Sequence, residues 1–514
     1  MKNLLTFATL ILLSFVIAPI SQAKNYFCQQ ELESLPIQQG GRVKPLYVHA
    51  GEAIKQLTGK SKIGDFKALE AYCLLSSRAL GIPNELKVMA RIDHVEVQKF
   101  LGLTADQHEV SYDELIPRLE EIRLAFMRIK ENNSYKKSLT TLFNSIHLYQ
   151  EITNGENWLL AELNGKEVVW NALPVYLTEA KVLEQKNKTP GAEPFLPVLM
   201  QSKTDYIKVK GDHYLLELTY AKAHLPEWTL VTTLLALGAL VLFKNPLPAL
   251  SLSGLTLVLQ TGFLVLRTLI SGRAPITNMY ETVLFSGYGA LLLAMVIGHF
   301  KKQTVYVYMG LAYNVCTLMM LNFANGMLTA SISPLVPVLR DNFWLSTHVT
   351  TIILSYGALA LSWILANTVL FKRRFGKITM KDDLFYSDVI YTTLKWGTTL
   401  LAAGIILGGV WADYSWGRFW GWDPKETWSL IVLCFYMAIL HGRYTSWIKP
   451  DRFITVTAAA FMSVMMAWFG VNYILASGLH SYGFSQGGAF FLGTFFTLQS
   501  LFILFTFKAK SLPA

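Results

Sequence analysis

Long apolar runs separated by short polar segments fill the C-terminal half of this chain. A helix that crosses a membrane needs about 20 predominantly apolar residues. Nine runs of roughly this length follow one another from about residue 229, and the first of them is short. The pattern predicts a mainly α-helical, polytopic membrane protein with about nine spanning helices, near 229–244, 247–270, 280–300, 304–323, 346–371, 391–411, 427–446, 453–476 and 488–507.

The first half of the chain has a different pattern. Residues 24–226 are polar and charged, and the stretch 111–152 carries apolar residues at helical spacing, which predicts one long helix or two. No catalytic constellation stands out in this half, where the histidines are scattered. We therefore expect a soluble, helix-rich domain at 24–226, followed by a membrane domain at 227–514.

The N-terminus reads as a targeting segment. Residues 1–23 combine a basic start at Lys2, an apolar run and a small-residue site before Lys24, as in a secretory signal peptide. The alternative is an uncleaved N-terminal anchor, since the run is near the lower limit for spanning. Either segment places the 24–226 domain outside the cytoplasm.

Composition and charge support a membrane protein. Of the 514 residues, 52% are hydrophobic and 16% are charged, whereas soluble domains carry roughly 25% charged residues. The formal net charge of +10 does not indicate a nucleic-acid partner, because the basic residues cluster in alternate short loops, as they do on the cytoplasmic side of membrane proteins. These clusters are Lys301–Lys302, 372–377, 443–452 and Lys508–Lys510.

Cysteine usage excludes two kinds of site. The four cysteines form neither a CxxC redox pair nor a CxxCH haem-attachment segment. Cys28 and Cys73 both lie in the expected extracytoplasmic domain, where a disulfide is chemically allowed. Sequence spacing does not show whether their sulfur atoms meet.

One polar loop, SWGRFWGWDPKETW at 415–428, interrupts the apolar half. It is either a crowded interfacial aromatic belt or the binding site of a planar cofactor. Trp416 and Trp420 would share one face if the segment were helical, and Arg418 and Lys425 could pair with carboxylates of a ligand. Asp423 either contacts the ligand or, with Glu426, caps the helix that follows.

Histidines flank this loop. By the alternation of spans, His348 and His480 share its outer face, whereas His441 and His299 lie toward the inner face. Imidazole is a common metal ligand and an axial ligand of haem iron, and ionisable residues inside spans are functional candidates. Two histidines beside an aromatic loop suit a planar macrocycle whose iron is ligated from both sides.

The loop also resembles the tryptophan-rich "WWD" signature of the haem-handling protein superfamily. Further stretches at 272–282, 331–339 and 478–484, with the His348 segment, resemble the CcsA-type half of the system II cytochrome c synthase. The resemblance covers roughly 229–514, and GGRVKPL at 40–46 resembles a stretch of the large fused forms. The signature falls on Trp416, Gly417, Trp420, Trp422, Asp423, Pro424, Glu426 and Trp428.

The resemblance implies a set of site residues. His348 and His480 would be the axial ligands of haem b, with ferrous iron, at the outer face, and His441 would serve an inner haem site. The second ligand of the inner site would come from a separate CcsB (ResB-like) chain, or that site differs, for instance with His299. The implied catalytic residues are His348, His480 and Asp423, and the implied haem contacts also include Trp416, Trp420, Trp422 and Arg418.

The implied function is cytochrome c biogenesis. The chain would deliver haem across the bacterial inner membrane and present it, on the periplasmic face, to the CxxCH segment of apocytochrome c for thioether formation. This cytochrome c synthase activity would depend on a CcsB-like partner and on a thiol-reducing thioredoxin-like protein. Three alternatives remain open: a CcmF-like haem lyase, a b-type haem quinol oxidoreductase, and a transporter without a cofactor.

Overall fold

The chain forms two compact units, which are described separately. The computed structural model describes residues 30–82, 85–104, 106–130, 134–176, 196–324, 327–335, 341–475, 488–509 and 511–512. One unit contains residues up to 39 and 43–212, and the other contains residues 40–42 and those from 213 onward. The expected signal segment at 1–23 lies outside the described residues and stays a prediction, as does the domain boundary at 226.

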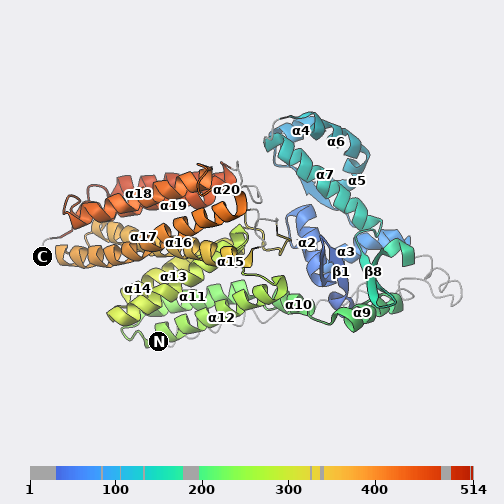
Figure 1. Cartoon of the computed structure of the whole chain (residues 1–514). Coiled ribbons are helices and arrows are strands. Elements are labelled where there is room, and N and C mark those ends of the chain that lie inside the picture. The colour runs from blue at the N-terminus through green and yellow to red at the C-terminus, as the bar shows by residue number, and fades with distance from the viewer. Residues whose placement is uncertain are drawn as a thin grey trace. The chain divides into compact units, whose positions relative to one another are not determined.

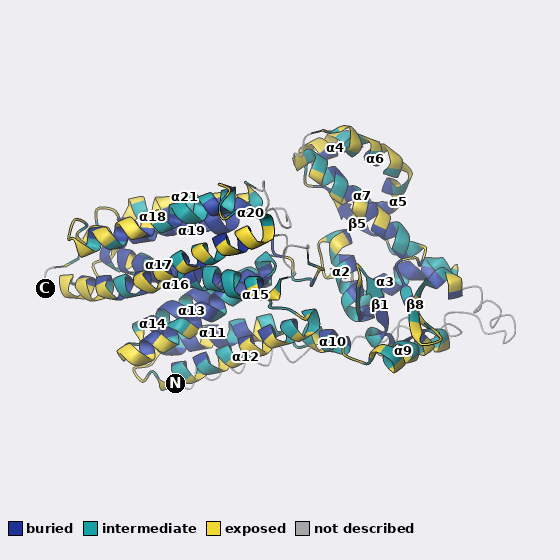
Figure 2. Cartoon of the chain, in the orientation of Figure 1, coloured by how far each residue is buried: buried dark blue, intermediate teal, exposed yellow. Residues whose placement is uncertain are grey.

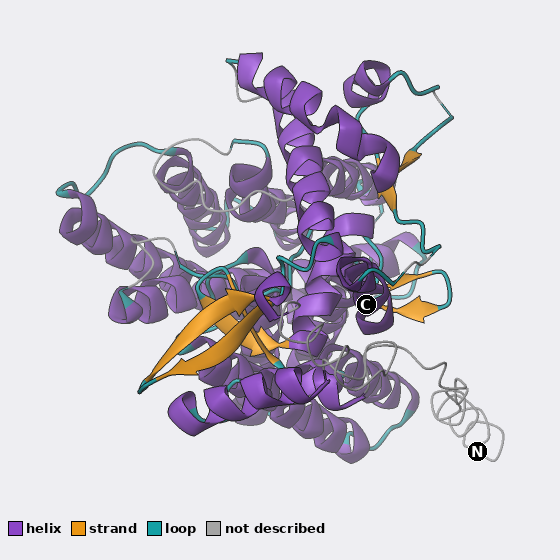
Figure 3. Ribbon diagram, turned by 90° about the vertical axis from the view of Figure 1, so that its right-hand side faces the viewer, coloured by secondary structure: helices purple, strands orange, loops and turns teal. Residues whose placement is uncertain are grey.

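Short helices and two-stranded sheets build the first unit, and Figure 3 shows the strands as small hairpins among helices. The expected helix at 111–152 is broken at two places. A 3₁₀ turn containing Pro117 ends α5, and the segment 129–133 separates α6 from α7. The helices are α2 (Leu46–Thr58), α3 (Ala68–Ser76), α4 (Val95–Leu101), α5 (Tyr112–Leu115), α6 (Leu119–Arg128), α7 (Ser134–Thr153) and α9 (Leu196–Lys210). The paired strands are β1 (Pro36–Gln39) with β2 (Arg42–Pro45), β3 (Lys62–Ile63) with β4 (Phe66–Lys67), β5 (Met89–Arg91) with β6 (Glu109–Ser111), and β7 (Leu159–Asn164) with β8 (Glu167–Ala172).

A polar network lies inside the core of the first unit. The fully buried His49 is bonded through Nε2 to Asn157 Oδ1 at 2.6 Å and to the Tyr72 hydroxyl at 3.0 Å, and through Nδ1 to Gln39 Oε1 at 2.9 Å. Burial lowers the pKa of His49 to about 3, and the nearby positive charge of Lys44 acts in the same direction. Cys73, in the same core, is disulfide-bonded, whereas Cys28 lies outside the described residues.

The second unit is a bundle of long helices (Figure 1). Its helices are α10 (Leu215–Lys222), α11 (Leu225–Leu242), α12 (Leu247–Ser271), α13 (Met279–Lys301), α14 (Val305–Phe323), α15 (Asn342–Trp344), α16 (Thr350–Arg374), α17 (Met380–Trp416), α18 (Pro424–Tyr444), α19 (Pro450–Met465), α20 (Val471–Tyr473) and α21 (Gly488–Thr506). Two π-helical turns, η6 (Leu345–Val349) and η7 (Met466–Gly470), join α15 to α16 and α19 to α20.

Eight helical segments among the described residues are long and apolar enough to cross a membrane. The sequence pattern predicts nine, and the difference is the run at 427–446, which the structure places in α18. This helix has 21 residues, which span about 31 Å at 1.5 Å per residue, but it begins with Lys425 and Glu426 and ends near His441 and Arg443. Because α18 packs against both α17 and α19, it still returns the chain along the bundle (Figure 1).

Charge marks one end of the bundle. Lys372, Arg373 and Arg374 occupy the last turn of α16, and Lys301 occupies that of α13. His348 precedes α16, so about 26 residues, or roughly 39 Å of helix, separate it from these basic side chains. The tryptophan-rich loop, which follows α17, lies at the His348 end.

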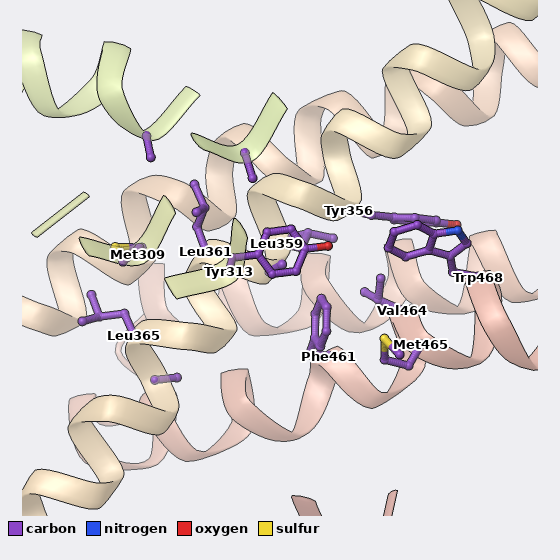
Figure 4. Close-up of a cluster of buried hydrophobic side chains, with 14 of the residues drawn as sticks. Met309, Tyr313, Tyr356, Leu359, Leu361, Leu365, Phe461, Val464, Met465 and Trp468 are labelled. Carbon is purple, nitrogen blue, oxygen red and sulfur yellow. The ribbon is translucent and has the colours of Figure 1, made fainter. Parts of the chain in front are cut away.

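The bundle core is apolar and closely packed. Tyr356 of α16 lies beside Trp468 of η7, with ring centroids 5.7 Å apart, and Figure 4 shows both among buried side chains of neighbouring helices. Large apolar side chains also face outward, including Val258 of α12 and Leu504 of α21. Figure 2 shows exposed positions along these peripheral helices. An outward apolar surface on long helices is the arrangement that a lipid environment requires.

Candidate functional site

A cavity opens at the end of the bundle that carries the tryptophan-rich loop. Its lining comes from five segments that are distant in sequence: the start of α13, η6 with α16, the end of α17, the loop with the start of α18, and η7 with α20. Both π-helical turns border it, through His348 and Trp468. Such turns interrupt the regular helix ladder and are frequent at functional sites.

His348 is held in one orientation by α17. Its Nδ1 lies 2.8 Å from the carbonyl oxygen of Gly404, so Nδ1 carries the proton and donates it. The lone pair of the neutral ring is then on Nε2, which is how a second hydrogen bond usually orients a metal-ligating histidine. The ring of Trp411 stands edge-on to the imidazole at 5.7 Å between centroids.

Glycines of α17 let the two helices approach at this point. A Cβ on Gly408 would lie 2.6 Å from Cε1 of His348, and a Cβ on Gly409 would lie 2.6 Å from Cζ of Phe419 in the loop. Real Cβ atoms do not approach other atoms so closely. Gly408 and Gly409 therefore create the space that the imidazole and the loop phenyl ring occupy.

The acidic residues of the loop order its backbone. Asp423 is the N-cap of α18 and accepts hydrogen bonds from the N–H groups of Lys425 and Glu426 at 2.9 and 3.1 Å. Glu426 completes a capping box with the N–H of Asp423 and also accepts the N–H of Gly421 at 2.6 Å. Of the two expected roles of Asp423, the structure shows the capping of α18, whereas contact with a ligand stays a prediction.

Arg418 is committed to the loop itself. Its Nη1 lies 3.2 Å from Glu426 Oε1, its guanidinium lies over the Trp416 ring at 5.7 Å, and a Cβ on Gly421 would lie 1.5 Å from Nη1. Trp422 takes a left-handed backbone conformation with φ of 58°, which costs free energy for a non-glycine residue. The ion pair and the cap together hold this strained turn.

The structure brings together only some of the predicted site residues. Trp416 and Trp420 line the cavity with His348, although the chain between them is not helical, so the premise that they share a helix face is wrong. Trp422, which is 70% exposed, and Asp423 and Arg418 do not line it. Lys425 does, and it is the one Lys or Arg among the lining residues that the structure describes.

The remaining histidines are elsewhere. His441 lies 17 residues into α18, about 25 Å along the helix from the loop, where it is exposed and its Nδ1 donates to the carbonyl of Met437 at 2.8 Å. His299 is at the far end of α13. His480 lies outside the described residues, so its distance from His348 stays a prediction. The described part of the chain holds no cluster of three His, Cys, Asp or Glu for a metal ion.

Sequence reasoning missed several residues that line the cavity. Trp411, Phe419, Tyr356 and Trp468 supply most of its aromatic surface together with the two loop indoles. The Gly408-Gly409 pair just before Trp411 could have indicated this site from the sequence, because small residues inside a spanning helix let another element approach closely. Tyr356 and Trp468 could not be found, because their pairing depends on how α16 and α19 pack.

Comparisons with known proteins agree with this arrangement. Residues 276–480, which include every cavity segment, match the model of the cytochrome C assembly protein family. The chain is 34% identical over 255 residues to the cytochrome c biogenesis protein CcsA of Guillardia theta, covering 45% of this chain and 81% of that protein. It is 33% identical over 270 residues to CcsA of Chlamydomonas reinhardtii, covering 50% of this chain and 75% of that protein.

A third relative is larger. The chain is 37% identical over 241 residues to Protein NrfI of Wolinella succinogenes, covering 44% of this chain but 25% of that protein. The matches to full-length relatives support a role in cytochrome c biogenesis, and hence in haem handling, for the membrane half. The chain belongs to the CcsA family of cytochrome c biogenesis proteins.

Proposed function

We propose that the chain delivers haem b across the membrane and holds it in the cavity beside the tryptophan-rich loop for covalent attachment to apocytochrome c. One observation carries the proposal. His348, with its tautomer set by the Gly404 carbonyl, borders the same cavity as Trp416 and Trp420. His480, at the end of the family match, would supply the second axial ligand.

The cavity suits part of a planar apolar ring. Its volume is about 210 Å³, whereas pockets that enclose whole drug-sized ligands are about 300–1,000 Å³. A haem would therefore insert one edge between the aromatic walls and leave the other edge accessible. That arrangement fits a substrate that must meet a peptide, because an enclosed ring could not be reached by the cysteines.

The cations of the loop have different parts in this proposal. Arg418 pairs with Glu426, which lines the cavity, and its contact with haem stays a prediction. Lys425 borders the cavity, and its amine would attract a propionate carboxylate. Asp423 acts by capping α18, which makes it a positioning residue.

The chemical step adds each thiol S–H of CxxCH across a haem vinyl group and forms a thioether. No electrons are gained or lost overall, provided that the thiols are reduced, which would require a thioredoxin-like reductant. Among the described residues that line the cavity, Glu426 is the only thiol or carboxylate group, and it is bonded within the loop. We infer that the chain contributes by orienting the reactants, an effect of up to about 7–11 kcal/mol in the best-oriented cases.

His441 would belong to an inner haem site. Its ring is exposed on α18 together with Cys434 and Met437, and a histidine on a lipid-facing surface is costly unless a partner covers it. We propose that a CcsB-like membrane subunit packs here and supplies the opposite ligand. His299 lies in the last turn of α13, and the proposed inner site does not use it.

Orientation follows from the two ends of the bundle. The basic last turns of α13 and α16 would face the cytoplasm by the positive-inside rule, and the cavity would then open on the periplasmic side of a bacterial inner membrane. Apocytochrome c would meet haem there.

The proposal is tested by expression with a CcsB-like subunit and a CxxCH substrate, without any haem chaperone. Replacement of His348 or His480 by Gly should lower the haem that copurifies and abolish the matured cytochrome, whereas the matched control His299→Ala should leave both unchanged. Normal maturation in the His348→Gly and His480→Gly variants would remove the outer site from the proposal. Maturation only when a haem chaperone is added would instead favour a CcmF-like lyase.

A further inference from the structure

A buried ion pair lies behind the loop that joins α12 to α13. Arg267 is fully buried and donates from Nε and Nη2 to Glu281 Oε1 at 3.1 and 2.6 Å. The second oxygen of Glu281 accepts the N–H and the hydroxyl of Thr277 at 2.8 and 2.7 Å. Both carboxylate oxygens are therefore used, and among the described residues Glu281 forms an ion pair with Arg267 only.

A second guanidinium, that of Arg273, lies in this loop. Its Nη2 donates to the carbonyl of Ser333 at 2.6 Å and lies 3.5 Å from the hydroxyl of Thr277, which borders the cavity. Its Nε is buried and meets no acceptor among the described residues. Arg273 also has no carboxylate within ion-pair distance in the described part of the chain. The carboxylate of Glu217, in the same unit, is paired with Arg42.

The rest of the membrane half does not supply the missing carboxylate. Its undescribed segments, at 325–326, 336–340 and 476–487, contain no Asp or Glu. Burial lowers the pKa of the Arg273 guanidinium, as expected for a charge that is removed from water, although the nearby carboxylate of Glu281 acts in the opposite direction. This corner of the bundle therefore carries one positive charge more than its carboxylates neutralise.

Trp411 provides a second donor without an acceptor. Its side chain is 9% exposed, and its buried Nε1–H meets no acceptor among the described residues. Trp411 borders the cavity, stands against His348, and clusters with Ile276 of the α12–α13 loop. Buried indole N–H groups in proteins usually have a hydrogen-bond acceptor. The lack of a described acceptor for Trp411 therefore points to a ligand.

We propose that Arg273 and Trp411 form a carboxylate-binding subsite at the edge of the cavity, and that the carboxylate is a propionate of the bound haem. The inference rests on the proposed function and adds the residues that orient the ring. A carboxylate would neutralise Arg273 and accept the N–H of Trp411, while Lys425, from the start of α18, would serve the second propionate. With its two propionates fixed, the macrocycle could present its vinyl edge in one orientation only.

The test compares haem with its dimethyl ester, which keeps the ring and the iron but has no carboxylates. Each is titrated into the purified full-length chain with its CcsB-like partner. We expect the wild-type protein to bind haem about tenfold or more tightly than the ester, because charge-assisted hydrogen bonds are strong. Arg273→Gln should remove most of this preference by weakening haem binding, with little change for the ester. Trp411→Phe, which keeps the ring, should reduce the preference several-fold.

Matched controls separate the subsite from the fold. Arg443→Gln removes a guanidinium that pairs with Asp388, and Trp363→Phe removes an indole N–H that bonds Gln499, both outside the cavity lining. Neither should change the haem-to-ester ratio. Equal loss of haem and ester in Arg273→Gln, or a wild-type protein without preference, would overturn the subsite and leave the proposed function intact. A wild-type protein that binds neither compound would contradict the proposed function itself.

The carboxylate could instead come from the peptide substrate. Binding of a CxxCH peptide with and without acidic residues is measured in the same variants. If Arg273→Gln weakens only the acidic peptide and leaves the haem-to-ester ratio unchanged, the propionate assignment is wrong.

Discussion

Gly408 lies directly against the imidazole of His348, so that a Cβ at this position would be 2.6 Å from Cε1 and 3.0 Å from Nδ1. The same ring is bonded to the carbonyl of Gly404, one helical turn earlier. The backbone of α17 thus sets both the tautomer and the position of the proposed ligand. Helix α17, which supplies none of the proposed iron-ligating histidines, therefore determines how the imidazole of His348 is oriented.

The first prediction follows from this contact. Gly408→Ala should displace the His348 ring and lower haem occupancy, since overpacking typically costs about 1–3 kcal/mol. Occupancy is measured by the haem absorbance of the purified protein. Gly254→Ala is the control, because no atom lies within 4 Å of a Cβ there, and it should not reduce haem. Full occupancy in Gly408→Ala would show that the imidazole is not positioned by α17.

The second prediction concerns Asp423. If this residue acts as a cap, Asp423→Asn should retain haem binding and maturation, because Asn is as good an N-cap as Asp. Asp423→Ala should cost about 1 kcal/mol of local stability and increase trypsin cleavage at Arg418 in the loosened loop. Loss of maturation in Asp423→Asn, with the loop still protected from trypsin, would instead assign a chemical role to the carboxylate.

The third prediction concerns the buried pair of Arg267 and Glu281. Glu281→Gln should destabilise the bundle by about 3–5 kcal/mol, because it leaves a buried guanidinium without its counter-ion. The double variant Arg267→Met with Glu281→Gln should recover part of this loss. Thermal unfolding in detergent measures both, and additive losses would argue that the two side chains are not coupled.

A fourth prediction addresses acid stability of the first unit. The pKa of His49 is about 3 in the folded protein and 6.5 when unfolded, so the unfolded chain binds the extra proton between these values. The stability of the unit should therefore be intact above about pH 6.5 and fall by up to ~1.4 kcal/mol per pH unit as the pH decreases toward 3.

The matched variant for this experiment is His49→Gln, which cannot titrate. Its unfolding temperature is compared with that of the wild type from pH 7 to pH 4. We expect the wild type to lose stability relative to the variant as the pH falls. Parallel curves would show that His49 is not buried in its neutral form.

Apolar periodicity predicted most of the membrane half, because a spanning helix must be apolar over nearly its whole length. The run at 427–446 is the instructive case. Its charged ends keep α18 outside the eight helices that are apolar enough to span. His348 and the tryptophan-rich loop still lie at one end, because only α16 and α17 separate them along the chain. That shared end was predicted from the alternation of spans and is confirmed by the common cavity.

The limits of sequence reasoning lie in side-chain contacts. The spacing of Trp416 and Trp420 suggested a helix face, but the αL residue Gly417 ends α17 between them. Trp416 therefore reaches the cavity from the last residue of α17, and Trp420 reaches it from the irregular loop. Arg418 was expected to contact a ligand, and the structure shows it paired with Glu426. The sequence does not show which negative group, a side chain or a ligand carboxylate, lies next to a guanidinium. The place of Trp411 in the cavity lining could not be predicted, because a tryptophan in an apolar run is also typical of an ordinary interfacial side chain.

The central claim is that His348 and His480 ligate one haem iron at the cavity. The most direct measurement is the spin state of the iron in the purified protein, by electron paramagnetic resonance and absorption, for the wild type and for His348→Gly and His480→Gly, each with and without imidazole. The account predicts low-spin, six-coordinate haem in the wild type, loss of that signal in either variant, and its recovery with imidazole. An unchanged low-spin signal in both variants would contradict it.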